Sequence, residues 1–99
     1  MEANEELQRL DLVVGRVTAA EAHAGARGQS ARLTLDLGPR GAAESTLPVA
    51  LETAEELVGR QVVCAVGSDA VAVLTVHSHA AGVVVVRPAQ EVEDGSPVA

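Results

Sequence analysis

The chain has 99 residues, 47% of them hydrophobic, which suits one domain with a modest core. It contains no Phe, Tyr or Trp, so the core has to be built from Val, Leu and Ala, and we expect a homodimer because a second copy would bury more apolar surface. Fourteen acidic residues against seven Arg and no Lys give a net charge of −7, which excludes the overall basic character of a strong nucleic-acid-binding protein.

The acidic residues gather at the two ends of the chain. Between residues 11 and 88, eight acids face six Arg, so this body is nearly neutral. We expect a single domain over 1–99, with an N-terminal helical extension (1–10), the body (11–88) and an acidic tail (89–99). The one cysteine, Cys64, lies in an apolar run and is expected to pack as a small hydrophobe. No apolar leader or membrane-length run occurs, and we therefore expect a cytoplasmic protein.

The N-terminal part of the chain predicts a short helix and a strand. Asn4 can cap a helix over 5–10, because an Asn side chain accepts a hydrogen bond from the first free N–H groups of a helix. A β-favouring run follows over 12–19, and Gly15 in its middle indicates a bulge or a close backbone approach. The Ala- and Gly-rich stretch over 21–30 has no apolar period and predicts a loop.

Two further strands are expected before the next helix. Residues 32–37 alternate between Leu and polar side chains, which is typical of a strand with one buried face. A turn over 38–41 leads to a strand over 44–51. Pro48 has no N–H to donate, so this strand should lie at an edge or end there.

The second half of the chain predicts one helical turn and three strands. Thr53 and Glu56 fit a capping box, with Gly59 just past the end, which predicts a helix over 54–58. Apolar, β-branched runs then predict strands over 61–66, 71–76 and 82–87. Three strands, a short helix and more strands is the order of a five-stranded Greek-key OB fold, an all-β barrel with its helix between strands three and four. An SH3-like barrel or a plain sandwich stays open, because strand count alone does not fix the topology.

Four blocks of the sequence resemble the tRNA-binding OB-fold domain family, and most of all its CsaA-type export chaperones. The blocks are DLVVGRV at 11–17, His23 to Arg27, LTLDLG at 33–38 and EELVGRQVV at 55–63. The fourth block carries most of the resemblance, and its residues would cap, pack and turn, so they mark the fold better than the ligand. The resemblance implies a homodimer without a cofactor, whose ligand is either tRNA or an extended segment of a preprotein.

The resemblance also implies where RNA would be contacted, and the chain departs from the pattern there. Val13 stands where the family has Arg, Ala24 replaces the Pro after His23, and Gly28 stands where Lys is common. The segment 69–73 lacks a basic pair, and His79 to Gly82 replaces the Gly-Met ending after the Ser. The remaining candidates for RNA or peptide binding are Arg16, His23, Arg27, Arg32, Arg60 and Ser78. The alternative for the Arg residues is an ordinary solvated or ion-paired surface.

Two kinds of function follow from these residues. Few cations and no aromatic platform for stacked bases predict that any tRNA binding is weak and salt-dependent. The alternative is a CsaA-like dimeric chaperone that binds extended preprotein segments, by strand addition along an exposed edge. The negative net charge favours the chaperone, because it attracts basic peptides and repels RNA. A degenerate OB-fold dimer without RNA binding is a third alternative. Clustering of the Arg set beside Ser78 would favour RNA.

Signals for an enzyme are weak. His77 and His79 share one face of a predicted strand, as metal ligands can, and His23 could add a third ligand. No carboxylate or Cys accompanies them, and surface histidines account for the pattern. Ser78 has neighbouring His residues but no Gly-rich nucleophile elbow. We therefore predict no catalytic residue and no metal site.

Overall fold

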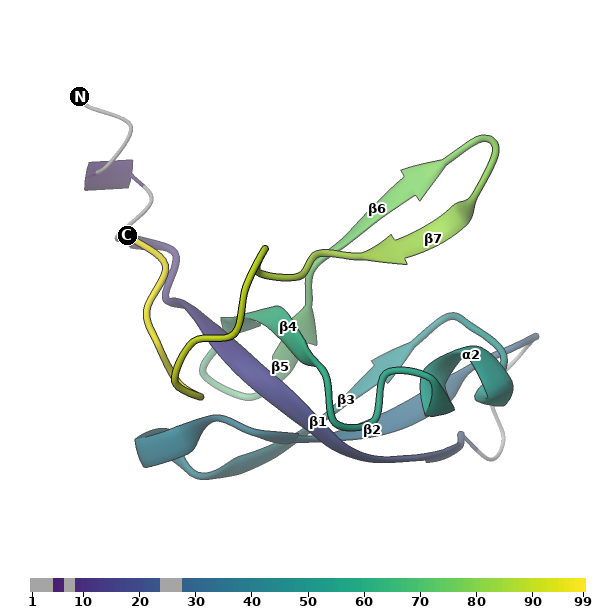
Figure 1. Ribbon diagram of the computed structural model, residues 1–99, viewed down its shortest axis with the longest axis horizontal. Helices are drawn as coiled ribbons and strands as arrows, with labels where there is room; N and C mark the ends of the chain where they lie inside the picture. Colours follow the sequence, from purple (N-terminus) through teal and green to yellow (C-terminus); the bar gives the residue numbers. More distant parts are fainter. Residues whose placement is uncertain (1–4, 7–8, 24–27) are drawn as a thin grey trace.

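The computed structural model describes residues 5–6, 9–23 and 28–99. Five strands form a nearly closed barrel (Figure 1): β1 (Leu12–Ala22), β2 (Ala31–Asp36), β3 (Ala42–Leu47), β4 (Gln61–Val66) and β5 (Val71–Val73). Their order is β3-β2-β1-β4-β5, and each neighbouring pair is antiparallel. The OB-type fold predicted from the sequence is confirmed. The helix predicted over 5–10 lies partly outside the described residues, and residues 5, 6 and 9 of it are helical.

Strand β1 is the centre of the barrel because its two halves pair with different neighbours. Leu12 to Arg16 pair with β4, and Arg16 to Ala22 pair with β2. The register shifts between Val17 and Ala19, as at a β-bulge, so the bulge does not lie at Gly15. A Cβ at Gly15 would lie 2.8 Å from Leu37 Cδ2, so Gly15 fits the other prediction, a close approach of its backbone to a neighbouring side chain.

The core consists mainly of Val, Leu and Ala side chains. The largest fully buried side chains are Leu33, Leu35, Leu47, Val17, Val62 and Cys64. The alternation predicted for β2 is confirmed, since Leu33 and Leu35 are 0% exposed, whereas the alternate residues Arg32 and Thr34 are half-buried and Asp36 is exposed. Cys64 is free and fully buried, so it packs as a small hydrophobe, and this burial raises the pKa of its thiol to about 11.

The helix between β3 and β4 begins earlier than the capping box predicts. Helix α2 covers Leu51–Glu55, its N-cap is Ala50, and no side chain caps it. Thr53 therefore lies inside the helix, and the predicted strand over 44–51 is replaced by β3, which ends just before Pro48. Packing of the fully buried Ala54 against β1 and β2 sets this register. No helix in the described part of the chain is long and apolar enough to cross a membrane.

The apolar run predicted as one strand over 71–76 is divided in two. The chain leaves the barrel at Leu74, whose N–H donates to the Val63 carbonyl, and forms a hairpin of β6 (Thr75–Ser78) and β7 (Gly82–Val85). Figure 1 shows this hairpin projecting away from the barrel. Val76 and Val84 on it are 54% and 40% exposed, so the hairpin presents apolar side chains that the described part of the chain leaves exposed.

The acidic C-terminal segment is bound to the barrel. It runs antiparallel to the first half of β1, with Gly95 N–H donating to the Val14 carbonyl (2.7 Å) and Val98 N–H to the Leu12 carbonyl (2.9 Å). The 3₁₀ turn η1 (Gly38–Arg40) contacts the same segment, since a Cβ at Gly38 would meet the Asp94 carbonyl. The segment therefore occupies the edge of β1 that β2 leaves free.

Candidate functional site

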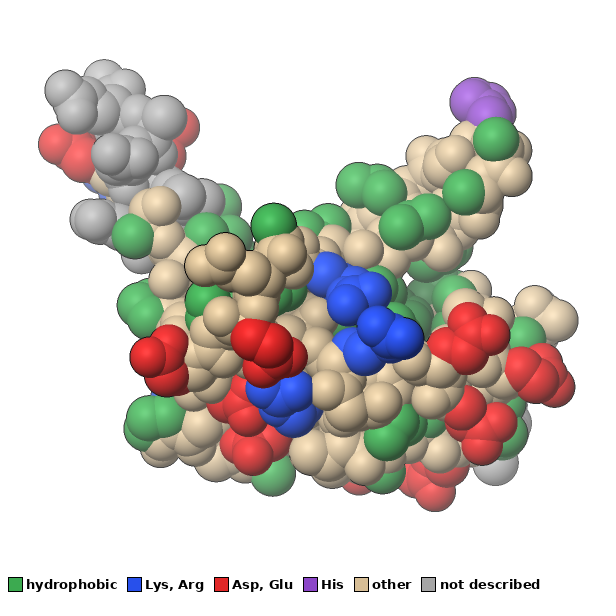
Figure 2. All heavy atoms as spheres, in the orientation of Figure 1, with side chains coloured by type: hydrophobic (Ala, Val, Ile, Leu, Met, Phe, Trp, Pro, Cys, Tyr) green, Lys and Arg blue, Asp and Glu red, His purple; other side chains and the backbone are tan. Residues whose placement is uncertain are grey.

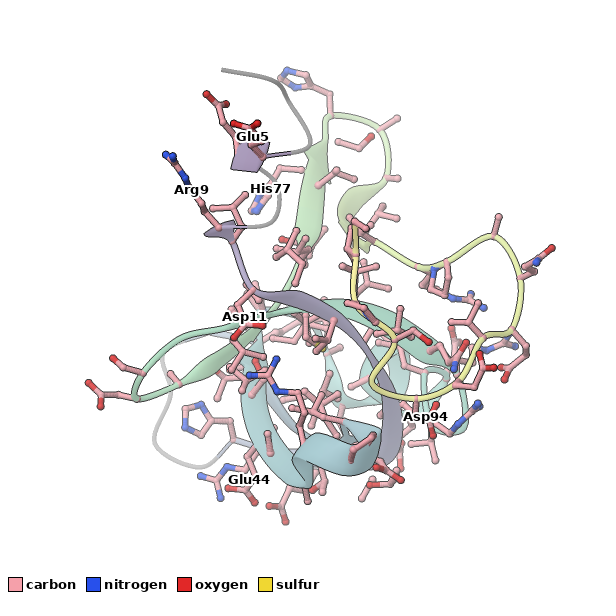
Figure 3. All side chains as sticks on the ribbon, turned by 90° about the vertical axis from the view of Figure 1, so that its left-hand side faces the viewer. Glu5, Arg9, Asp11, Glu44, His77 and Asp94 are labelled. Carbon is pink, nitrogen blue, oxygen red and sulfur yellow. The ribbon has the colours of Figure 1, made fainter. Side chains whose placement is uncertain are left out.

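The site residues predicted from the sequence lie in three separate places. His23 and Arg32 line a cleft between β3 and β5, Arg16 and Arg60 lie beside the C-terminal segment, and Ser78 lies on the hairpin. Arg27 lies outside the described residues. Figure 3 marks the three places by Glu44, Asp94 and His77, which point in different directions from the barrel. The clustering beside Ser78 that would favour an RNA groove is absent among the described members of the set.

The first place is a cleft of about 470 Å³ at the seam of the barrel. The seam is the line along which β3 and β5, the two ends of the sheet, contact each other without being paired as strands. We call this the seam cleft; its lining residues are His23, Arg32, Glu44, Ser45, Thr46, Ala70, Val71 and Ala72. Two unpaired strand edges beside a cleft can accept an extended chain.

The polar groups of the seam cleft are only partly engaged within the protein. His23 Nδ1 lies 3.3 Å from Ser30 Oγ, and Arg32 Nη1 lies 3.6 Å from Glu21 Oε1 on the neighbouring strand β1. Glu44 is exposed at the rim of the cleft. The positive charge of Arg32 is balanced by Glu21, and Glu44 adds a negative charge, so the cleft has no excess of positive charge. This arrangement suits a neutral or basic ligand better than a polyanion.

Arg16, at the second place, is held by carboxylates of its own chain. Its Nη2 lies 2.6 Å from Glu91 Oε2, its Nε lies 3.2 Å from an Asp94 carboxylate oxygen, and Nη1 donates to the Gly59 carbonyl at 2.8 Å. The guanidinium lowers the pKa of Glu91, and hydrogen bonds from Gln61 and then Arg16 lower the pKa of Asp94. Arg16 thus fastens the C-terminal segment to β1, and its donors are used inside the chain.

Arg60 lies nearby but lines a different, polar cleft of about 320 Å³ together with Arg87. We call this the arginine cleft; Gly59, Gln61 and residues 88–91 complete its lining. Figure 2 shows Arg side chains gathered in the middle of one face, below the hairpin and between groups of acidic side chains. Sequence reasoning missed Arg87, because it stands alone at the end of an apolar run.

Ser78 has a structural task at the third place. Its hydroxyl accepts hydrogen bonds from the N–H groups of Ala80 (3.2 Å) and Ala81 (3.0 Å), which orders the turn of the hairpin. His77 belongs to the same hairpin, whereas His23 lies in the seam cleft. In the described parts of the chain, no three His, Cys, Asp or Glu side chains come together as a metal site.

A third cleft, apolar and about 540 Å³ in volume, lies where the chain enters β1. Its lining joins the start of β1 to β4 and β5: Arg9, Leu10, Asp11, Leu12, Ala65, Val66, Gly67, Ala70, Ala72 and Leu74. Leu10 is 58% exposed there. We call it the apolar groove. Figure 1 shows the hairpin and residues 9–11 on the same side of the barrel.

The chain is similar over its full length to three solved structures. Chaperone CsaA of Bacillus anthracis str. Ames is 30% identical, with a TM-score of 0.78 and coverage of 100% of this chain and 99% of that one. The CsaA chaperone protein of Picrophilus torridus is 20% identical (TM-score 0.81, 100% of both chains). The MetRS related protein of Pyrococcus horikoshii is 19% identical (TM-score 0.75, 99% and 97%), and these last two likenesses bear on the fold alone. No protein-family model and no curated protein matches the sequence.

Proposed function

We propose a function from the finding that the chain belongs to the CsaA family of tRNA-binding-type OB-fold proteins. In this proposal it is a cytoplasmic, non-enzymatic homodimer, and it binds extended polypeptide segments as a chaperone does. The observation that supports this most is the seam cleft, which lies along two strand edges that are not paired with each other. An unfolded segment entering there would continue the sheet from β3 or β5. Its main chain would then supply the affinity, and little of its sequence would be read.

The side chains around the seam cleft suit such a ligand. Ser45, Ala70 and Ala72 are small, so they leave space for larger side chains of a bound segment. The protein has no aromatic side chain of its own to fill the cleft, so bulky apolar side chains of the ligand would occupy this space. Glu44 at the rim and the net charge of −7 attract basic segments over acidic ones.

The test is a binding titration of fluorescent ten-residue peptides by polarisation. A basic, apolar peptide is expected to bind, and the same peptide with alternate backbone nitrogens methylated is expected to lose most of its affinity, because methylation removes the N–H donors of strand addition. Thr46→Arg places a long cation in the seam cleft and should weaken binding about tenfold or more. Thr53→Arg, the same change on the exposed face of α2, is the matched control. Equal binding of the two peptides would contradict strand addition.

Weak tRNA binding is the second candidate, and one observation favours it. Arg60 and Arg87 line one cleft and make no ion pair within the described residues. Two such cations neutralise few phosphates, so binding would fall steeply as salt is raised. A titration with bulk tRNA at ~50 mM salt, where phosphate contacts are strongest, decides between the candidates. Saturable tRNA binding that Arg60→Gln abolishes would favour RNA.

The homodimer in this proposal would use the apolar groove and the exposed valines of the hairpin. These are exposed apolar surfaces of the described part of the chain, whereas the C-terminal segment pairs with its own β1. Val76→Lys should shift the protein to monomers in sedimentation velocity, because a buried ammonium without a partner is costly. Ala80→Lys, at the tip of the same hairpin, is the control. An unchanged dimer in Val76→Lys would remove the hairpin from the interface.

A further inference from the structure

The arginine cleft is a second binding feature, independent of the seam cleft, with which it shares no lining residue. Three of the described arginines are neutralised by carboxylates of the same chain: Arg16 by Glu91 and Asp94, Arg32 by Glu21 and Arg40 by Asp11. Arg60 and Arg87 differ, because no Asp or Glu in the described parts of the chain lies within 4.0 Å of either guanidinium. They nevertheless face one cleft.

The one carboxylate in the cleft wall is already committed. Both oxygens of Glu91 accept hydrogen bonds from Arg16, at 3.2 and 2.6 Å. The floor is similarly fixed, since the Gln61 amide donates to the Val92 carbonyl and accepts from the Val92 N–H. Within the described residues, Arg60 and Arg87 therefore have no anionic partner in this cleft. In a protein of net charge −7, this is a local positive site.

The donors that remain define the ligand chemistry. Arg60 donates Nε–H to the Glu56 carbonyl at 3.0 Å, which orients its guanidinium and leaves its two terminal nitrogens available. A guanidinium presents paired N–H donors in a plane that matches two oxygens of one anion. Two guanidinium groups in one cleft can together bind an anionic group of the ligand that has three or more oxygens and two negative charges. A phosphate monoester has this shape and charge.

The geometry points to the arginine cleft as a binding site for a phosphate group, either free or as the monoester of a small organic molecule. The cleft volume of about 320 Å³ is at the lower end of small-molecule sites, and exceeds what inorganic phosphate fills. Pro88 and Ala89 provide an apolar wall for the remainder of a ligand, and Gln90 provides an amide. This site goes beyond the proposed peptide binding and does not depend on it.

The experiment follows ¹⁵N-labelled full-length protein in titrations with inorganic phosphate, adenosine 5′-monophosphate and uncharged adenosine. We expect both phosphate compounds to shift the Gly59 and Gln61 amides and the Arg60 and Arg87 Nε–H signals saturably, and adenosine to shift none of them. Tighter binding of the monophosphate would assign an organic phosphate ester, and equal binding would assign free phosphate. Arg60→Gln and Arg87→Gln should each weaken binding about tenfold or more, since each removes charge-assisted hydrogen bonds.

Arg40→Gln is the matched control, because Arg40 pairs with Asp11 and does not line the arginine cleft. The proposal is overturned if adenosine binds as well as its monophosphate or if Arg40→Gln weakens binding as much as the two cleft variants. It is also overturned if no signal saturates below ~10 mM phosphate, a concentration well above a millimolar Kd. Binding of tRNA without binding of either small phosphate compound would also overturn it, in favour of general attraction to a polyanion. Peptide binding at the seam cleft should be unchanged in Arg60→Gln and Arg87→Gln, which separates the two sites.

Discussion

Arg16 on β1 and Asp94 in the C-terminal segment lie 78 positions apart in the sequence and are joined by a hydrogen bond of 3.2 Å from Arg16 Nε to a carboxylate oxygen. Asp94 also accepts from Gln61 Nε2 at 2.8 Å, so one carboxylate ties the segment to both β1 and β4. The residue that the family pattern offered as an RNA contact thus holds the two ends of the fold together. This relationship yields three predictions.

Removing the charge of Arg16 should loosen the C-terminal segment without unfolding the barrel. In Arg16→Gln, the amides of Gly95 and Val98, which donate to β1, should exchange with solvent several-fold faster, while core amides of β2 keep their protection. Arg32→Gln removes an ion pair to Glu21, with 3.6 Å between Nη1 and Oε1, on the half of β1 that pairs with β2, and serves as the control. Equal exchange in both variants would show that backbone pairing alone holds the segment.

Acid should release the same segment. The pKa values of Glu91 and Asp94 are lowered from their ordinary values of 4.5 and 3.8, so both carboxylates bind protons less readily in the folded protein. Their stabilising contribution is therefore fully present above about pH 4.5 and is lost as the pH falls through the lowered values. Exchange of the Gly95 amide, corrected for the intrinsic rate, should rise over that range. In Arg16→Gln this rise should be much smaller, and a rise of the same size would assign it to other carboxylates.

Gly38 should be required for the segment to lie against η1. It has a positive φ of 65°, and a Cβ there would overlap the Asp94 carbonyl. Gly28 also has a positive φ, 71°, but a Cβ there would meet nothing within 4 Å among the described residues. Gly28→Ala should therefore cost about 1 kcal/mol from backbone conformation alone. Gly38→Ala should cost roughly 1–3 kcal/mol more, because overpacking is added. Urea unfolding measures both, and equal losses would contradict the contact.

The features predicted correctly from the sequence are those that depend on neighbouring residues. The alternation of Leu33 and Leu35 with polar residues is a local period, and it fixes which face of β2 is buried. The capping box at Thr53 is also local, but burial of Ala54 against two strands outweighs the gain from one side-chain cap. Tertiary packing thus decided where α2 begins.

The C-terminal segment and the clefts could not be predicted in this way. An acidic stretch with Gly, Ser and Pro is typical of a solvated tail, and its order comes from backbone pairing with a strand some 80 residues earlier. The arginine cleft likewise joins Arg60 and Arg87, which belong to no common motif. Of the predicted site residues that the structure describes, only His23 and Arg32 lie together in one cleft, because β1 and β2 are consecutive strands of one hairpin.

Ser78 should affect the hairpin and not the binding of a ligand directly. Its hydroxyl accepts from two backbone N–H groups of the turn, so Ser78→Ala leaves Ala80 and Ala81 without these bonds. Loss of these bonds should lower the free energy of local opening by about 1 kcal/mol, which makes the exchange of those two amides roughly fivefold faster. Ser68→Ala, in the turn between β4 and β5, is the control, because its change should leave the hairpin amides unaffected. The opposite result would be that Ser78→Ala abolishes tRNA or peptide binding while the Ala80 and Ala81 amides exchange at the wild-type rate. The hydroxyl would then be a ligand contact, and its structural role would be secondary.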